Sequence, residues 1–95
     1  MSSDILKKLR ILKPRMQQEW GMTNIRLFGS YALGKENQNS DIDLLVDFKR
    51  PIGLIALNQI QNSLEEELEK PVDLVTEACL YKNLKEKILH EAIHV

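Results

Sequence analysis

The sequence has little of what membrane-bound or secreted chains contain. It has no apolar run longer than four residues, so no segment is expected to cross a bilayer. Its single cysteine, Cys79, excludes an internal disulfide and is typical of a reducing compartment. The first eight residues lack the apolar region of a signal peptide. We therefore expect a cytoplasmic protein with no membrane contact.

An excess of positive charge is also missing. Thirteen Lys and Arg residues against fourteen Asp and Glu residues give a net charge of −1. This balance excludes a protein that coats nucleic acid with positive charge, and we expect no direct nucleic-acid binding. With 95 residues, of which 43% are apolar, the chain is long enough for one modest core. We expect one domain that spans residues 1–95.

The hydrophobic spacing predicts the order helix, strand, turn, strand, helix, strand, helix. Apolar residues three and four apart predict helices over residues 4–20, over 54–69 and from about 81 to the end. Short or alternating apolar runs predict strands over 24–28, 41–48 and 72–75. Residues 31–39 are predicted to form a turn, or one helical turn followed by a loop. Pro14 predicts a kink or a break in the first helix.

The most informative pattern is a pair of carboxylates in the second predicted strand, at Asp41 and Asp43. Residues two apart on a strand project from the same face, with Cα atoms about 6.6 Å apart. Both side chains could then bind one or two divalent cations such as Mg²⁺, which prefers oxygen ligands. Asp73, an isolated acid in the third strand, would join them if the two strands are neighbours.

Two other interpretations of this pair stay open at this point. Ser40 and Asp43 also fit the spacing of a helix capping box, although the strict alternation after them favours a strand. Acids on the surface of a strand are common, so the pair needs a second motif to support a functional role. Gly29-Ser30 is such a motif, because a glycine that leaves a strand allows close backbone approach and the following amides could hold an anion.

The spacing between the two motifs carries a resemblance. Gly29-Ser30, ten residues, and then Asp41-Ile42-Asp43 match the Gly-Ser-x10-Asp-x-Asp signature of the DNA polymerase beta-like nucleotidyltransferases. Nearly the whole chain resembles the minimal nucleotidyltransferase (MNT) family, the antitoxins of HEPN/MNT toxin–antitoxin systems. The resemblance implies an α/β (α+β) nucleotidyltransferase fold, in which helices flank a short mixed β-sheet.

The resemblance also implies roles for these residues. Asp41, Asp43 and Asp73 would be the catalytic, metal-binding carboxylates for two Mg²⁺ ions, and Asp73 would activate the acceptor hydroxyl. Gly29 and Ser30 would bind the triphosphate of ATP. The implied activity is Mg²⁺-dependent transfer of AMP from ATP to a hydroxyl, of a tyrosine above all, on a cognate HEPN toxin. A partner would also be needed to complete the site, in a hetero-oligomer or beside a homodimer.

One departure from the family pattern keeps a second interpretation open. Leu33 stands where the family usually has an arginine, and Lys35 is near enough in sequence to replace that charge. The alternative for Leu33 itself is a packing residue on the short helix. If the missing arginine matters, the chain would be a non-catalytic antitoxin that neutralises its partner by binding alone.

Two features of the C-terminal segment complete the predictions. His90 and His94 match the His-Glu-x-x-His pattern of zinc proteases and would share a helix face, but a third ligand is missing and we expect no functional zinc. The apolar positions of the last predicted helix, Leu84, Ile88 and Ala92, are expected to pack on the domain, with partner binding as the alternative.

Overall fold

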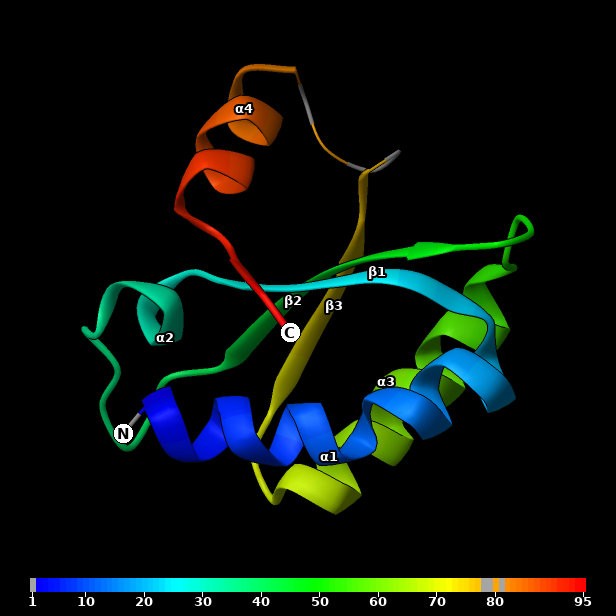
Figure 1. Cartoon of the computed structure of the whole chain (residues 1–95), viewed down its shortest axis with the longest axis horizontal. Coiled ribbons are helices and arrows are strands. Elements are labelled where there is room, and N and C mark those ends of the chain that lie inside the picture. The colour runs from blue at the N-terminus through cyan, green and yellow to red at the C-terminus, as the bar shows by residue number, and fades with distance from the viewer. Residues whose placement is uncertain (1, 78–79, 81) are drawn as a thin grey trace.

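The structure, a computed structural model, describes residues 2–77, 80 and 82–95 (Figure 1). Cys79 and the predicted helix start at Tyr81 lie outside these residues. The elements in chain order are α1 (Ser2–Trp20), β1 (Met22–Phe28), α2 (Ser30–Leu33), β2 (Ile42–Phe48), α3 (Leu54–Leu68), β3 (Val72–Thr76), α4 (Lys82–Glu91) and β4 (Ile93–His94). None of the helices in this described part is long and apolar enough to span a membrane.

The strands form one mixed sheet in the order β3-β2-β1-β4. β1 is antiparallel to both β2 and β4, whereas β2 and β3 run parallel. The long helices α1 and α3 cover one face of the sheet and α4 lies over the other (Figure 1). The expected mixed sheet flanked by helices is therefore confirmed.

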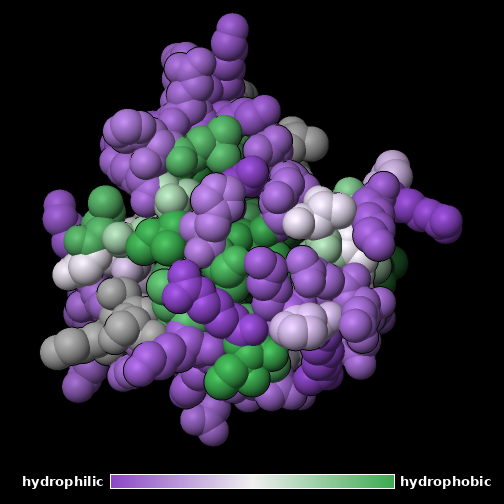
Figure 2. All heavy atoms as spheres, viewed as in Figure 1, coloured by the Kyte–Doolittle hydropathy of each residue, from purple (hydrophilic) through white to green (hydrophobic). Residues whose placement is uncertain are grey.

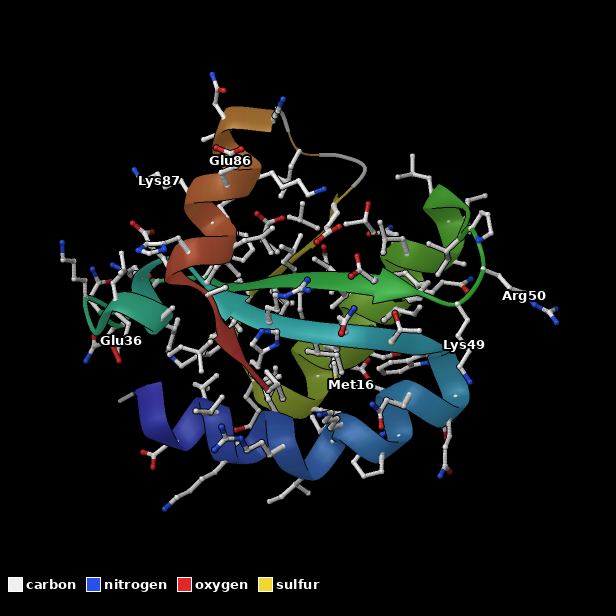
Figure 3. The ribbon with its side chains drawn as sticks, turned by 45° about the horizontal axis from the view of Figure 1, so that its top comes forward. Met16, Glu36, Lys49, Arg50, Glu86 and Lys87 are labelled. Carbon is white, nitrogen blue, oxygen red and sulfur yellow. The ribbon has the colours of Figure 1, made fainter. Side chains whose placement is uncertain are left out.

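The core fills the space between the sheet and the two long helices. Met16 points from α1 toward the sheet (Figure 3) and is fully buried. The predicted apolar stripes of both helices supply much of this core, together with alternate residues of the strands: Ile5, Leu9, Ile25, Leu27, Ile42, Leu44, Val46, Ile60, Leu64, Leu68, Val72 and Leu74. Leu45 points to the opposite face of β2 and is buried too.

Two predictions about where helices end were wrong. Of the kink or break predicted at Pro14, the break is absent: α1 continues through the proline, because the predicted stripe on either side of it packs as one buried face. The last helix stops at Glu91, and residues 93–94 pair with β1 as the strand β4. The side chain of Lys13 donates a hydrogen bond of 2.9 Å to the carbonyl of Val95, which is itself buried, and this holds the end of the segment in extended form.

The expected packing of the last helix is also only partly present. No residue of α4 is buried, and Leu84 is 50% exposed, whereas Ile88 and Ala92 are half-buried. Glu86 and Lys87 point away from the sheet (Figure 3). α4 therefore contributes little to the core, most of whose helical residues come from α1 and α3.

The turn between α3 and β3 contains a strained residue. Glu69 ends the helix with φ 57° and ψ 32°, the left-handed region that side chains other than glycine and asparagine rarely adopt. Its amide donates to the carbonyl of Glu65 over 2.8 Å, which is the usual bond of such a helix end.

Glu69→Gly should therefore stabilise the protein by about 1 kcal/mol, because glycine adopts this backbone conformation without strain. Urea unfolding measures this gain in unfolding free energy, provided that the dependence of the free energy on urea concentration is the same in both chains. The matched control is Glu66→Gly, since Glu66 is also exposed but lies inside the helix. That variant should lose about 1 kcal/mol. Equal losses in both variants would contradict the assignment of strain to Glu69.

Candidate active site

The strand β1 leads into the glycine turn that the sequence singled out. Gly29 has φ 74° and ψ −152°, a conformation open to glycine almost alone. A Cβ atom at this position would also overlap the carboxylate of Asp43 on the neighbouring strand. Two independent constraints, backbone conformation and close approach, therefore require glycine here. α2 follows at once, and the carbonyl of Gly29 accepts hydrogen bonds from the amides of Ala32 and Leu33.

The two central carboxylates meet because β2 and β3 are parallel neighbours. Asp43 and Asp73 are register partners, one on each strand, and such strands lie about 4.8 Å apart. Phe28, at the end of β1, is the register partner of Asp43 on its other side. The prediction that Asp73 lies beside the first pair if the strands are neighbours is therefore confirmed.

Asp41 stands just before β2 rather than within it. The amide of the next residue, Ile42, donates to the carbonyl of Pro71 over 2.9 Å, which fixes the start of the strand against the segment that leads into β3. Asp41 and Asp73 are exposed, whereas Asp43 is half-buried. The capping-box alternative for Ser40 is excluded, because Asp43 belongs to a strand and the Ser40 hydroxyl accepts from the amide of Asn37.

The electrostatics of the site show how close the acids are. Partial burial, the charge of Asp73 and the charge of Asp41, in that order, raise the pKa of Asp43 from its ordinary 3.8 to about 6. Within the described residues none of these three carboxylates forms an ion pair with a basic side chain. The three like charges therefore gather without compensation from the protein.

This donor set fits Mg²⁺ in the way nucleotide sites do. Carboxylate oxygens are the ligands that Mg²⁺ prefers, and one or two of them usually act together with substrate phosphates. Over the part of the chain that the structure describes, no group of three or more His, Cys, Asp or Glu side chains is placed so that it could hold a metal ion by itself. A Mg²⁺ ion at these acids would therefore also need oxygen ligands from a bound phosphate or from water.

A network at the other end of the same face was missed by the sequence analysis. The guanidinium of Arg26 on β1 lies 3.5 Å from Asp47 and 3.4 Å from Glu77, and Lys85 of α4 lies 3.5 Å from Glu77. These pairs connect α4 to the sheet. The only signal in the sequence is a polar residue that alternates with the buried Ile25 and Leu27.

The two remaining sequence motifs are placed differently from the expectation. His90 belongs to α4 and His94 to β4, so the two histidines do not share a helix face. Leu33 is 46% exposed, and its interpretation as a packing residue was wrong. Lys35 is exposed just beyond α2.

Comparison with known proteins agrees with this geometry. The nucleotidyltransferase domain family matches residues 9–95, and the chain therefore belongs to this family of enzymes. It is 35% identical, over 94% of its own length and 91% of the relative's, to a Methanocaldococcus jannaschii protein named as a candidate protein adenylyltransferase. A solved candidate minimal nucleotidyltransferase superposes on it with a TM-score of 0.85 and 34% identity, covering 100% of this chain and 97% of that one.

A third similarity is to a complex. A chain of a solved assembly of tri-AMPylated Shewanella oneidensis HEPN toxin with MNT antitoxin matches with a TM-score of 0.62 and 26% identity. The match covers 98% of this chain and 66% of that chain. The expected resemblance to minimal nucleotidyltransferases is thus confirmed.

The raised pKa of Asp43 predicts a pH-dependent stability. Folding favours the protonated carboxyl, so the contribution of Asp43 is fully present below about pH 4 and is lost as the pH rises through about 6. Without divalent cations, Asp43→Asn should therefore gain on the order of 1 kcal/mol relative to the native chain between pH 4 and 8, after allowance for solvent screening. Urea midpoints at both pH values measure the difference. A constant difference would contradict the crowding of the three acids.

Proposed function

We propose that this chain transfers AMP from ATP to a hydroxyl group, of a tyrosine above all, on a HEPN toxin and thereby neutralises the toxin. The observation that carries the proposal is the set of three uncompensated carboxylates beside the turn at Gly29. Divalent cations would offset the repulsion within this set, and a bound triphosphate would complete the coordination of those cations. The similar proteins reported above, a candidate protein adenylyltransferase and a complex with an AMPylated HEPN toxin, support the same activity.

In this proposal each residue of the site has a distinct task. The turn at Gly29 and the hydroxyl of Ser30 receive the triphosphate, and the missing Cβ atom of Gly29 lets the carboxylate of Asp43 lie against this turn. Asp41 and Asp43 would hold two Mg²⁺ ions, which neutralise the phosphates and the leaving group when bound. Asp73 is exposed, so that in this proposal an acceptor hydroxyl can reach its carboxylate.

The reaction is an in-line displacement at the α-phosphorus. The acceptor oxygen forms a bond to this phosphorus, and the bond to the oxygen that bridges to the β-phosphate breaks. Pyrophosphate leaves with that electron pair, and Asp73 accepts the proton of the acceptor hydroxyl. The protein contributes position and charge, which are the main sources of catalysis for phosphoryl and nucleotidyl transfer.

An external partner is expected because the surface has apolar groups that the core does not absorb. Figure 2 shows hydrophobic side chains gathered between α1 and α4 on one face of the molecule. Leu54 and Ile55 at the start of α3 are 82% and 78% exposed. Leu84 is half exposed on α4, which keeps open the alternative that this helix binds the partner. A homodimer stays a prediction.

A second candidate function is neutralisation of the toxin by binding alone. The observation in its favour is Leu33, an exposed apolar residue where the resembling family has an arginine. The two functions are separated by incubating the chain with the HEPN toxin, Mg²⁺ and ATP labelled at the α-phosphate. Label on the toxin supports transfer, whereas a stable complex without label supports binding alone.

Asp41→Asn and Asp43→Asn should each lower labelling of the toxin by at least about 100-fold, because each removes a ligand for the ions that stabilise the transition state. Both variants should still fold and bind the toxin. The matched control, a His90→Ala and His94→Ala double variant, should label at the native rate. Native labelling by either Asn variant would contradict the assignment of the carboxylates.

A further inference from the structure

The outer edge of β3 is bonded to side chains of α3. β3 is the last strand of the sheet, so half of its amides point away from β2. The carboxylate of Glu65 accepts a hydrogen bond of 2.9 Å from the amide of Val72, and the side-chain carbonyl of Gln61 accepts one of 3.1 Å from the amide of Leu74. Both bonds are partly buried and cross from helix to strand.

The spacing of these acceptors matches the spacing of the donors. Gln61 and Glu65 are four residues apart on a helix, which is a rise of about 6 Å along one face. Val72 and Leu74 are two residues apart on a strand, about 6.6 Å. Side chains on one face of α3 can therefore hold two successive outward amides of β3.

The residue between these two amides is Asp73. Its carboxylate is exposed and, among the described residues, forms no ion pair. The position of this carboxylate is therefore determined by the backbone of β3. On its inner side that backbone pairs with β2, where Asp43 is the register partner of Asp73. We propose that Gln61 and Glu65 are positioning residues, which hold the backbone on both sides of Asp73 and so keep its carboxylate beside Asp43.

This inference rests on the proposed function, in which Asp73 accepts the proton of the acceptor. β3 has only five residues and its outer side faces no other strand, so without the two acceptors its amides would bond to water. A displacement of about 1 Å at a catalytic group lowers rates by up to about 100-fold. ATP binding, assigned to Gly29, Ser30, Asp41 and Asp43, does not depend on these bonds.

A matched pair of double variants tests the role. Gln61→Met with Glu65→Met keeps the side-chain lengths and removes both acceptor oxygens. Gln61→Glu with Glu65→Gln exchanges the two residues, which keeps both acceptors and the net charge. The measurements are kcat and KM for ATP in toxin labelling, and hydrogen exchange at the amides of Val72 and Leu74.

We expect the methionine pair to lower kcat at least about tenfold, with KM for ATP within twofold of the native value. Exchange at both amides should become at least about tenfold faster. The variant that combines Gln61→Glu with Glu65→Gln should have the native kcat, and hydrogen exchange at both amides should be as slow as in the native chain. Faster exchange with a native kcat in the methionine pair would overturn the positioning role.

If the proposed function is wrong, the experiment gives a result that differs from a failure of the positioning role. If the native chain labels no toxin, transfer is excluded, and crystal structures of the native chain and the methionine pair decide the positioning role. A carboxylate of Asp73 that has moved away from Asp43 in the methionine pair supports the role. An unchanged separation of the two carboxylates overturns it.

Discussion

The parallel pairing of β2 with β3 determines what this molecule can do. It places Asp43 and Asp73 side by side, and the charges of Asp73 and Asp41 oppose the ionisation of Asp43. Hydrophobic burial on the opposite face of β2 offsets this repulsion, because Ile42 and Leu44, on either side of Asp43, are fully buried. Each such side chain contributes about 1.5–3 kcal/mol on burial, which exceeds a repulsion of on the order of 1 kcal/mol at a partly exposed site. The core thus holds the acids where they are unstable alone.

The two ends of this sheet face differ in how their charges are balanced. At one end Arg26 lies between Asp47 and Glu77, and Lys85 joins the same group from α4. At the other end the described residues offer no basic side chain to the three acids. The protein could have balanced both ends in the same way. The uncompensated end is where cations from solution would supply the missing positive charge, and where phosphates could bind to those cations.

Most of the fold and the composition of the site could be predicted from the sequence, because both depend on local patterns. The stripe of α3 and the alternation of β2 have the periods of their secondary structures, and the spacing from Gly29 to Asp41 carries the family resemblance. Tertiary contacts decided the rest. β4 forms where β1 offers a free edge and Lys13 bonds to the carbonyl of Val95, and no local pattern distinguishes residues 93–94 from a helix end.

The site shows the same division between local pattern and tertiary contact. The sequence indicated that Gly29 allows close approach, but not that Asp43 is the group that approaches it. It likewise gave no sign of the bonds from Gln61 and Glu65 to β3, because polar residues on a helix surface are usually solvated. Contacts between elements distant in the sequence carry this information, and no single segment contains it.

The central claim is that the three acids and the glycine turn form one nucleotide–metal site. A crystal structure of the chain with Mn²⁺ and AMP-PNP, recorded with anomalous diffraction, tests it most directly. We expect manganese peaks within coordination distance of carboxylate oxygens of Asp41 and Asp43, with the phosphates against Gly29 and Ser30. Nucleotide bound elsewhere on the molecule, with no manganese at these carboxylates, would contradict it.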